Sequence, residues 1–306
     1  MQLTKWLLVA LPVLSALSGA AGAARAQAPG EYAGSEVCMQ CHQASADAFA
    51  KTAMGKLFMA HPRSEVQKRG CEGCHGPGAA HAASGGTERA GMLRFGKGTK
   101  NSVAERNAVC LQCHEQGARM FWQGSTHESR DLACTNCHIV MSEVSERGNL
   151  KYPTVLNTCA QCHLHRASQQ LRFSHMPLRE GKMECSSCHN PHGTPNDKLL
   201  IASTVNEVCY SCHAEKRGPF LHEHPPVTEN CANCHDSHGS NHEKLLKTAK
   251  PRLCQQCHDP TRHPSRAYAM NDPTAIPVRF IPGRQCVNCH FAIHGSNHPG
   301  GSRFTR

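Results

Sequence analysis

Residues 209–213 read Cys209-Tyr210-Ser211-Cys212-His213, and residues 231–235 read Cys231-Ala232-Asn233-Cys234-His235. Each stretch places two residues between its cysteines and follows the second cysteine directly with a histidine. The same C-x-x-C-H unit occurs ten times in the 306-residue chain and takes up all 20 cysteines. One repeated unit therefore accounts for every thiol in the protein.

The spacing of this unit is the one that attaches a c-type haem. Two thiols about one helical turn apart can bind the two vinyl groups of the porphyrin, and the adjacent histidine then faces the iron. Zinc sites and redox-active thiol pairs also use C-x-x-C, and an exported cysteine-rich protein can form a disulfide framework. Ten units, each completed by a histidine, favour haem over these alternatives.

We therefore predict ten covalently bound haems c, and we number their sites 1 to 10 in chain order. The cysteines expected to form the thioether bonds are Cys38, Cys41, Cys71, Cys74, Cys110, Cys113, Cys134, Cys137, Cys159, Cys162, Cys185, Cys188, Cys209, Cys212, Cys231, Cys234, Cys254, Cys257, Cys286 and Cys289. The motif histidines expected to bind the iron are His42, His75, His114, His138, His163, His189, His213, His235, His258 and His290.

A second axial ligand for each iron must come from elsewhere in the chain. Subtracting the ten motif histidines from the total of 23 leaves 13, which is enough for bis-histidine ligation at every site. Methionine is the alternative ligand, and Met176 beside His175 is one candidate. A Met/His pair would raise the reduction potential of the haem. With histidines in surplus, we interpret the ten methionines as packing residues against the porphyrin edges.

The motifs alternate between two settings, so the repeat unit contains two haems. Odd-numbered motifs such as those at Cys110 and Cys209 follow capping-box patterns, Ser102-x-x-Glu105 and Thr204-x-x-Glu207, which predict short helices. Even-numbered motifs lie in turn-rich loops. From the second unit on, the odd motifs recur at steps of 49, 50 and 45 residues, which indicates a repeat architecture. The expected units span roughly residues 35–100, 101–150, 151–200, 201–247 and 248–306.

The positions of the remaining histidines within this repeat select the distal ligands. Most of them lie 10 or 7 residues before an even motif, or just after one. On this basis the expected distal ligands are His61, His81, His127, His165, His175, His192, His224, His238, His263 and His294. His165 is the nearest substitute in the second unit, whose even motif has no histidine after it. A histidine so close to its own motif should bind a neighbouring haem, and His222, His242 and His298 remain as surface histidines.

The first 26 residues have the features of a secretory signal. Lys5 gives a positive start, residues 6–17 an apolar core, and Ala24-Arg25-Ala26 a small-residue cleavage site. The apolar run is shorter than the roughly 18 residues that a transmembrane helix needs. We therefore expect an exported mature chain, residues 27–306, that forms one decahaem cytochrome c domain.

The composition predicts the fold class. Aromatic residues make up only 5% of the chain, so apolar side chains alone are too few to offset the entropy of ordering the backbone. We expect ten haems to form the core, with loops and short α-helices around them, minimal β structure and an elongated stack of two-haem units. The formal net charge of +10 is dispersed and is balanced largely by haem propionates. With few aromatic residues for base stacking, this charge does not indicate nucleic-acid binding.

Three further segments are typical of a known family. They are Gly218-Pro219-Phe220-Leu221, then His224-Pro225-Pro226-Val227 leading into the site 8 motif, and Ile293-His294-Gly295-Ser296-Asn297-His298-Pro299. With the ten motifs, they make essentially the whole mature chain resemble the periplasmic decahaem cytochromes of the MtrA/DmsE type, which include the Pio and Mto iron-oxidation cytochromes. His222 is a departure, since relatives carry an aromatic residue there. Either His222 or His224 is therefore the ligand, and the spacing favours His224.

The resemblance implies a haem wire inside an outer-membrane β-barrel porin. Such a wire would connect periplasmic donor or acceptor cytochromes with an extracellular cytochrome, reductase, metal oxide, ferrous iron or sulfoxide system. We expect a periplasmic electron carrier associated with the outer membrane, not an enzyme. Two alternatives stay open, a freely diffusing periplasmic shuttle and a multihaem reductase. A reductase commonly replaces a motif histidine to open one iron, and no motif here does so.

Overall fold

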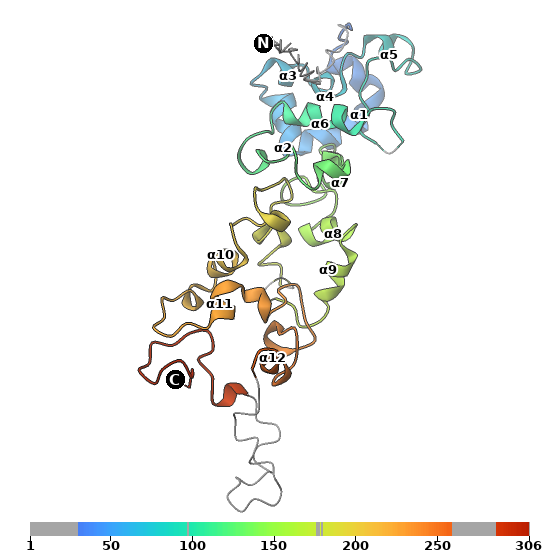
Figure 1. The fold of residues 1–306 in the computed structure, drawn as a ribbon. Helices are drawn as coiled ribbons and strands as arrows, with labels where there is room; N and C mark the ends of the chain where they lie inside the picture. Colours follow the sequence, from blue (N-terminus) through green and yellow to red (C-terminus); the bar gives the residue numbers. More distant parts are fainter. Residues whose placement is uncertain (1–29, 97, 176–177, 179, 259–285, 306) are drawn as a thin grey trace, which may run out of the picture.

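The computed structural model describes residues 30–96, 98–175, 178, 180–258 and 286–305. This part of the chain is an elongated body, with its N-terminal segments at one end and its C-terminal segments at the other (Figure 1). It consists of short helices joined by loops, and the described residues form no β-strand. The predicted fold class is thereby confirmed. The predicted signal peptide and Met176 lie outside the described residues.

Most helices have only one or two turns. They are α1 (Ser35–Lys51), α2 (Ala53–Gly55), α3 (Glu65–Lys68), α4 (Glu72–His75), α5 (Ala79–Ala83), α6 (Val103–Leu111), α7 (Cys134–Cys137), α8 (Val155–Ala160), α9 (Leu164–Gln169), α10 (Val205–Tyr210), α11 (Pro225–Glu229) and α12 (Arg252–Gln255). Lys56–Ala60 forms a π-helical segment, η1. Single 3₁₀ turns are η2 (Gly117–Arg119), η3 (Glu128–Arg130), η4 (Cys185–Ser187), η5 (Asp197–Leu199), η6 (Ala214–Lys216), η7 (Cys231–Asn233), η8 (Glu243–Leu245) and η12 (Cys286–Asn288). Within the described residues, none of the helices combines the length and the apolar character needed to cross a bilayer.

Side-chain caps start three of the helices that carry odd-numbered motifs, α6, α8 and α10. At α6, Ser102 Oγ accepts a hydrogen bond from Glu105 N (3.1 Å), and Glu105 Oε2 accepts one from Ser102 N (2.8 Å). At α10, Thr204 Oγ1 accepts a hydrogen bond from Glu207 N (3.1 Å). These bonds satisfy backbone donors that a helix start leaves without a partner. The first cysteine of each motif then falls in the last turn of its helix.

A returning loop follows each of three even-numbered motifs. In each case the residue at the end of the loop forms an isolated antiparallel bridge with the motif histidine. The bridges are His138 with Leu150, His189 with Leu200, and His235 with Leu246. Lys198 and Leu199 adopt left-handed conformations (φ 56° and 58°), and so do Lys244 and Leu245 (φ 56° and 57°). Left-handed backbone is uncommon outside glycine, so its recurrence shows that these two loops share one conformation.

The buried apolar core is thin. In the described part of the chain, the buried apolar side chains are Ala46, Phe49, Phe58, Leu93, Trp122, Ala133, Val208 and Leu246. The rings of Phe49 and Phe58 meet edge to face with centroids 6.3 Å apart, which packs α1 against η1. So few buried side chains cannot balance the entropy of ordering the backbone, and the body needs further buried surface between its loops.

Successive two-haem units contact each other through tight turns. Phe173 forms an antiparallel bridge with Ser240, and His222 forms another with Ser296. Each bridge joins the segment before one even motif to the loop after the next even motif. At Gly239 (φ +131°), a Cβ atom would lie only 2.2 Å from the carbonyl oxygen of Gln169 in the preceding unit. Glycine is therefore required at this contact between the two units.

Candidate haem sites

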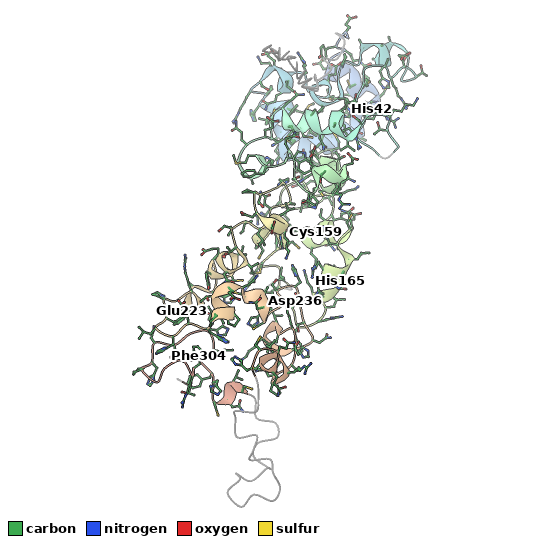
Figure 2. The ribbon with its side chains drawn as sticks, viewed as in Figure 1. His42, Cys159, His165, Glu223, Asp236 and Phe304 are labelled. Atoms are coloured by element: carbon green, nitrogen blue, oxygen red, sulfur yellow. The ribbon has the colours of Figure 1, made fainter. Side chains whose placement is uncertain are left out.

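Histidines that are distant in sequence face each other in pairs. Within the described residues, seven pairs of imidazole rings have centroids 5.9–6.4 Å apart. Each pair combines one motif histidine with one histidine from outside the motifs. The pairs are His42–His81, His163–His127, His138–His192, His213–His175, His189–His238, His258–His224 and His235–His294. The pairs are spread along the length of the body. In Figure 2, His42 lies towards one end, and Phe304, whose ring contacts that of His224, lies towards the other.

The separation of the rings fits one iron atom between them. With metal–nitrogen bonds of about 2.0 Å and ring nitrogens about 1.1 Å from their centroids, two imidazoles on one metal have centroids about 6.2 Å apart. The observed range of 5.9–6.4 Å includes this value. The paired residues therefore fit a six-coordinate haem iron with histidine on both faces.

Backbone carbonyls hold the second ring nitrogen of every even-numbered motif histidine. Hydrogen bonds connect Nδ1 of His75 with Leu93 O (2.9 Å), His138 with Gly148 O (2.7 Å), His189 with Lys198 O (2.8 Å), His235 with Lys244 O (2.8 Å), and His290 with Arg303 O. A histidine that donates from Nδ1 keeps Nε2 available for a metal, and its ring orientation is fixed. Each returning loop thus supplies the group that orients its own motif histidine.

Burial favours the neutral form of several distal histidines. Burial, together with the neighbouring His138 and Arg119, lowers the pKa of His192 to about 4. Burial also lowers the pKa of His238 and of His294. An uncharged imidazole has the lone pair that a metal requires, so these side chains are suited to bind iron.

Six of the seven pairs follow one rule along the chain, whereas His81, downstream of site 2, faces His42 of site 1 in the same unit. A histidine upstream of an even motif faces the motif histidine of the next odd site, as in His127–His163, His175–His213 and His224–His258. A histidine downstream of an even motif faces the motif histidine of the previous even site, as in His192–His138, His238–His189 and His294–His235. Downstream histidines therefore reach back into the preceding unit and connect it to their own.

The motif thiols show the order of the sites in space. Electrostatic interactions between thiols connect every site with the next one in the chain. The contacts are Cys38–Cys71, Cys74–Cys113, Cys110–Cys134, Cys137–Cys162, Cys159–Cys185, Cys188–Cys212, Cys209–Cys231, Cys234–Cys257 and Cys254–Cys286. The ten sites therefore lie in single file, in sequence order.

These contacts also affect the free thiols before a haem is attached. A hydrogen bond from Cys110 lowers the pKa of Cys134 to about 7, and one from Cys159 lowers the pKa of Cys185 to about 7. Burial and the Cys231 thiol raise the pKa of Cys209 to about 12. All 20 cysteines are free thiols, and the described residues contain no group of three or more histidine, cysteine or acidic side chains placed to hold a metal ion.

Some predicted ligands are not in the ring pairs. His61 lies between η1 and α3, and His165 lies on α9 with its side chain exposed. Neither ring faces another histidine ring within the described part of the chain. His263 lies outside the described residues. His298 accepts a hydrogen bond at Nδ1 from Gly300 N (2.9 Å), which places its proton on Nε2 and disfavours iron binding there.

Protein-family models support the interpretation of the C-x-x-C-H motifs as haem attachment sites. A doubled CXXCH motif matches residues 175–218 and 224–263, and a cytochrome c-type, NrfB-like model matches residues 71–152. Together with the paired histidines, these matches define a multihaem c-type cytochrome that transfers electrons.

The relatives place the chain within this class. It is 45% identical over 287 residues to the multihaem cytochrome MtrA of Shewanella baltica, covering 91% of this chain and 84% of the relative. It is 26% identical over 222 residues to the C-type polyhaem cytochrome OmcC of Geobacter sulfurreducens, covering 59% of this chain and 26% of that protein. The chain belongs to the MtrA family of multihaem cytochromes.

Proposed function

We propose that the protein binds ten haems c and conducts electrons through them from one end of its body to the other. The single-file order of the ten motifs is the observation that carries this proposal. A bound haem iron would supply a centre that accepts and returns one electron, and the thiols of successive sites would hold their haems next to each other. No site needs to be bypassed, because the thiols of every site interact with those of the next site in the chain.

The ligand set we propose uses histidine on both faces of most irons. The motif histidines bind on one face, and the paired histidines bind on the other, as the ring separations support. His61 lies as far before Cys71 as His175 lies before Cys185. By the same pairing rule, His61 would bind the iron of site 3 on the face opposite His114. An iron with two axial protein ligands has no open position for a substrate. This ligand set therefore favours an electron carrier over a reductase.

The proposed setting is the outer membrane. We infer that the mature chain enters the periplasm and occupies a β-barrel porin, where it connects periplasmic cytochromes with an extracellular cytochrome, reductase or mineral. Support comes from the family, from the signal sequence and from the elongated body with sites along its whole length. A soluble shuttle needs no such length, because it exchanges electrons at one exposed edge.

Two measurements test the proposal. A pyridine haemochrome assay on the purified protein should return ten haems per polypeptide, and fractionation of the native cells should recover the protein with the outer membrane, together with a β-barrel protein. A measured content well below ten haems per polypeptide would refute the proposed row of ten haems. Recovery of the decahaem protein wholly in the soluble periplasmic fraction would refute the conduit and leave the shuttle.

A further inference from the structure

Site 2 is followed by another even motif, yet the pairing rule finds no histidine for it in the loop after that motif. Under that rule, an even-numbered motif histidine faces a side chain from the loop after the next even motif. The loop after site 4, residues 139–149, should therefore serve His75. This loop contains no histidine.

The same loop contains one residue that can bind haem iron stably. Proteins ligate haem iron through histidine, cysteine, methionine or tyrosine, and of these residue types the loop has only Met141. Met141 stands three residues after His138, just as His192 stands three residues after His189. We propose that Met141 is the distal axial ligand at site 2, which gives that haem a His75/Met141 pair.

The unit of sites 3 and 4 is built like the unit of sites 7 and 8, so the two loops can be compared position by position. Asn107 Oδ1 accepts a hydrogen bond from Cys134 N (2.8 Å), and Asn206 Oδ1 accepts one from Cys231 N (2.7 Å). Both asparagines stand three residues before the first cysteine of an odd motif and hold the following even motif in place. The register that identifies His238 as the partner of His189 therefore identifies Met141 as the partner of His75.

The described contacts also bring this loop towards site 2. The Phe95 ring meets the His75 ring edge to face, with centroids 5.5 Å apart. The carbonyl oxygen of Phe95 accepts a hydrogen bond from Thr135 Oγ1, inside the site 4 motif (3.5 Å). The site 4 motif and the residues around His75 are thus connected through Phe95, and the loop of Met141 begins directly after that motif.

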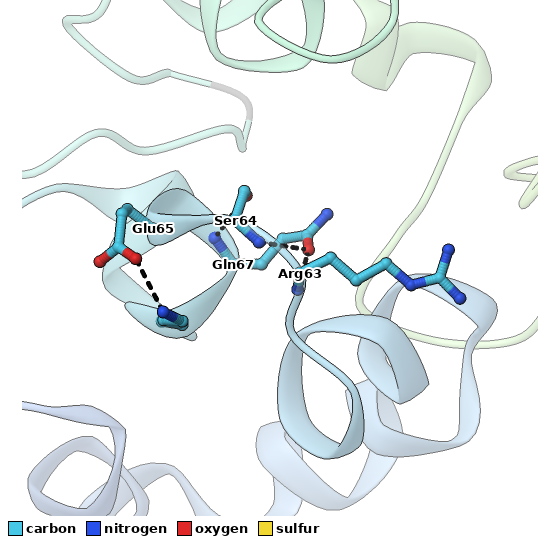
Figure 3. Close-up of polar contacts among 5 residues, drawn as sticks. Arg63, Ser64, Glu65 and Gln67 are labelled. Atoms are coloured by element: carbon cyan, nitrogen blue, oxygen red, sulfur yellow. Dashed lines mark hydrogen bonds and ion pairs between the residues drawn. The ribbon is translucent and has the colours of Figure 1, made fainter.

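The other histidines near site 2 have different partners or lie too far away. His81 faces His42 at site 1. His61 has the spacing of His175, which faces the next odd site, His213, so His61 corresponds to site 3. The chain just after His61 is held by α3, where Gln67 Oε1 accepts hydrogen bonds from Arg63 N (2.6 Å) and Ser64 N (3.1 Å) (Figure 3). His165 lies on α9, which Figure 1 places well away from α4, beyond α6 and α7.

A methionine ligand changes what site 2 does in the wire. Compared with imidazole, a thioether favours ferrous iron and raises the reduction potential of the haem. Site 2 would then be the first of the N-terminal sites to be reduced and the last to be oxidised. The inference rests on the proposed haem attachment but not on a porin partner.

The test begins with the fully oxidised, purified holoprotein. Near-infrared magnetic circular dichroism separates low-spin ferric haems with His/Met ligands from those with two histidines by the position of the charge-transfer band. We expect a His/Met band with the intensity of one haem in ten. Only bis-histidine bands in a protein that retains ten haems would overturn the Met141 assignment and leave the wire intact. A protein with far fewer than ten haems would instead overturn the proposed function.

Three variants then test which methionine gives rise to the His/Met band. Met141→His should abolish the His/Met band, retain ten low-spin haems and lower the potential of the most easily reduced haem. Met141→Ala should convert one haem to a high-spin form that binds carbon monoxide when reduced. Met120→Leu, at a methionine whose side chain is 63% exposed, should leave the band unchanged. A His/Met band that persists in Met141→His would assign the ligand to another methionine and contradict the proposal.

Discussion

The imidazole ring of His224 faces that of His258 with centroids 6.1 Å apart and 23° between the ring planes. His224 comes from the segment before site 8, whereas His258 completes the motif of site 9, so the two rings belong to different two-haem units. The carbonyl oxygen of Ile293, from the loop after site 10, lies 3.0 Å from Nδ1 of His224. Three segments that are far apart in sequence therefore meet at one site, and haem binding there also joins two units.

We expect His224→Ala to make the haem at site 9 high-spin and His222→Ala to leave every haem low-spin. His224 supplies a ring at ligand distance, whereas the backbone of His222 forms a bridge with Ser296 that does not need an imidazole. Electron paramagnetic resonance of the oxidised variants measures the change directly. A high-spin signal in His222→Ala with none in His224→Ala would reverse the assignment of the two histidines.

Much of this arrangement could be predicted from local patterns. The C-x-x-C-H units fix where haems attach, and the Ser102 and Glu105 capping box fixes where a helix begins, because both depend on residues a few positions apart. Counting histidines also indicated ligands from outside the motifs. These features need no knowledge of how distant segments pack.

The pairing of distal ligands could not be predicted in this way. Whether His238 faces site 6 or site 10 depends on the packing between units, which the bridge from Phe173 to Ser240 and the close approach at Gly239 determine. The second unit shows the same limit. A count of histidines suggests His165 as a ligand there, whereas the three-dimensional rule leads to Met141, which is not a histidine.

Substitution of Gly239 by alanine should weaken the contact between units. An alanine there would meet the Gln169 carbonyl oxygen at 2.2 Å and would also carry the cost of its positive φ, about 1–2 kcal/mol. Gly124→Ala is the matched control, because Gly124 has φ +78° but no atom within 4 Å of the added Cβ. Thermal unfolding followed by circular dichroism should show a clearly lower midpoint for Gly239→Ala than for Gly124→Ala. Equal midpoints would mean that the close approach at Gly239 does not limit stability.

Asn206 should contribute more to stability than its neighbour Asn233. Its buried side chain accepts a hydrogen bond from Cys231 N and donates to the carbonyl oxygens of Val227 and Thr228. Asn206→Ala leaves these groups without partners, and we expect a loss of about 2–3 kcal/mol, since each buried unsatisfied group costs about 1–3 kcal/mol.

The control for this change is Asn233→Ala, because exposed Asn233 makes one side-chain hydrogen bond, to Pro226 O. Water can replace that bond, so its loss should change stability by less than about 0.5 kcal/mol. Denaturant unfolding of the holoproteins, compared by midpoint, measures both effects. A larger loss for Asn233→Ala would show that Asn206 does not hold the site 8 motif.

The single-file order of the sites makes a prediction about interruption. Replacing Cys185 and Cys188 by alanine removes the haem at site 6, between the thiol contacts Cys159–Cys185 and Cys188–Cys212. Replacing Cys38 and Cys41 removes the haem at site 1, which has a thiol contact only towards site 2. Both variants should contain nine haems, which makes them a matched pair.

In vesicles that hold the protein in the proposed porin partner, only the site 6 variant should lose electron transfer from an internal reductant to an external acceptor. Its rate should fall to that of vesicles without the cytochrome, because site 5 and site 7 have no direct thiol contact with each other in the described chain. The site 1 variant keeps a continuous row of nine sites and should retain transfer. Similar rates in the two variants, with the other nine haems still low-spin, would mean that electrons pass site 6 by another route.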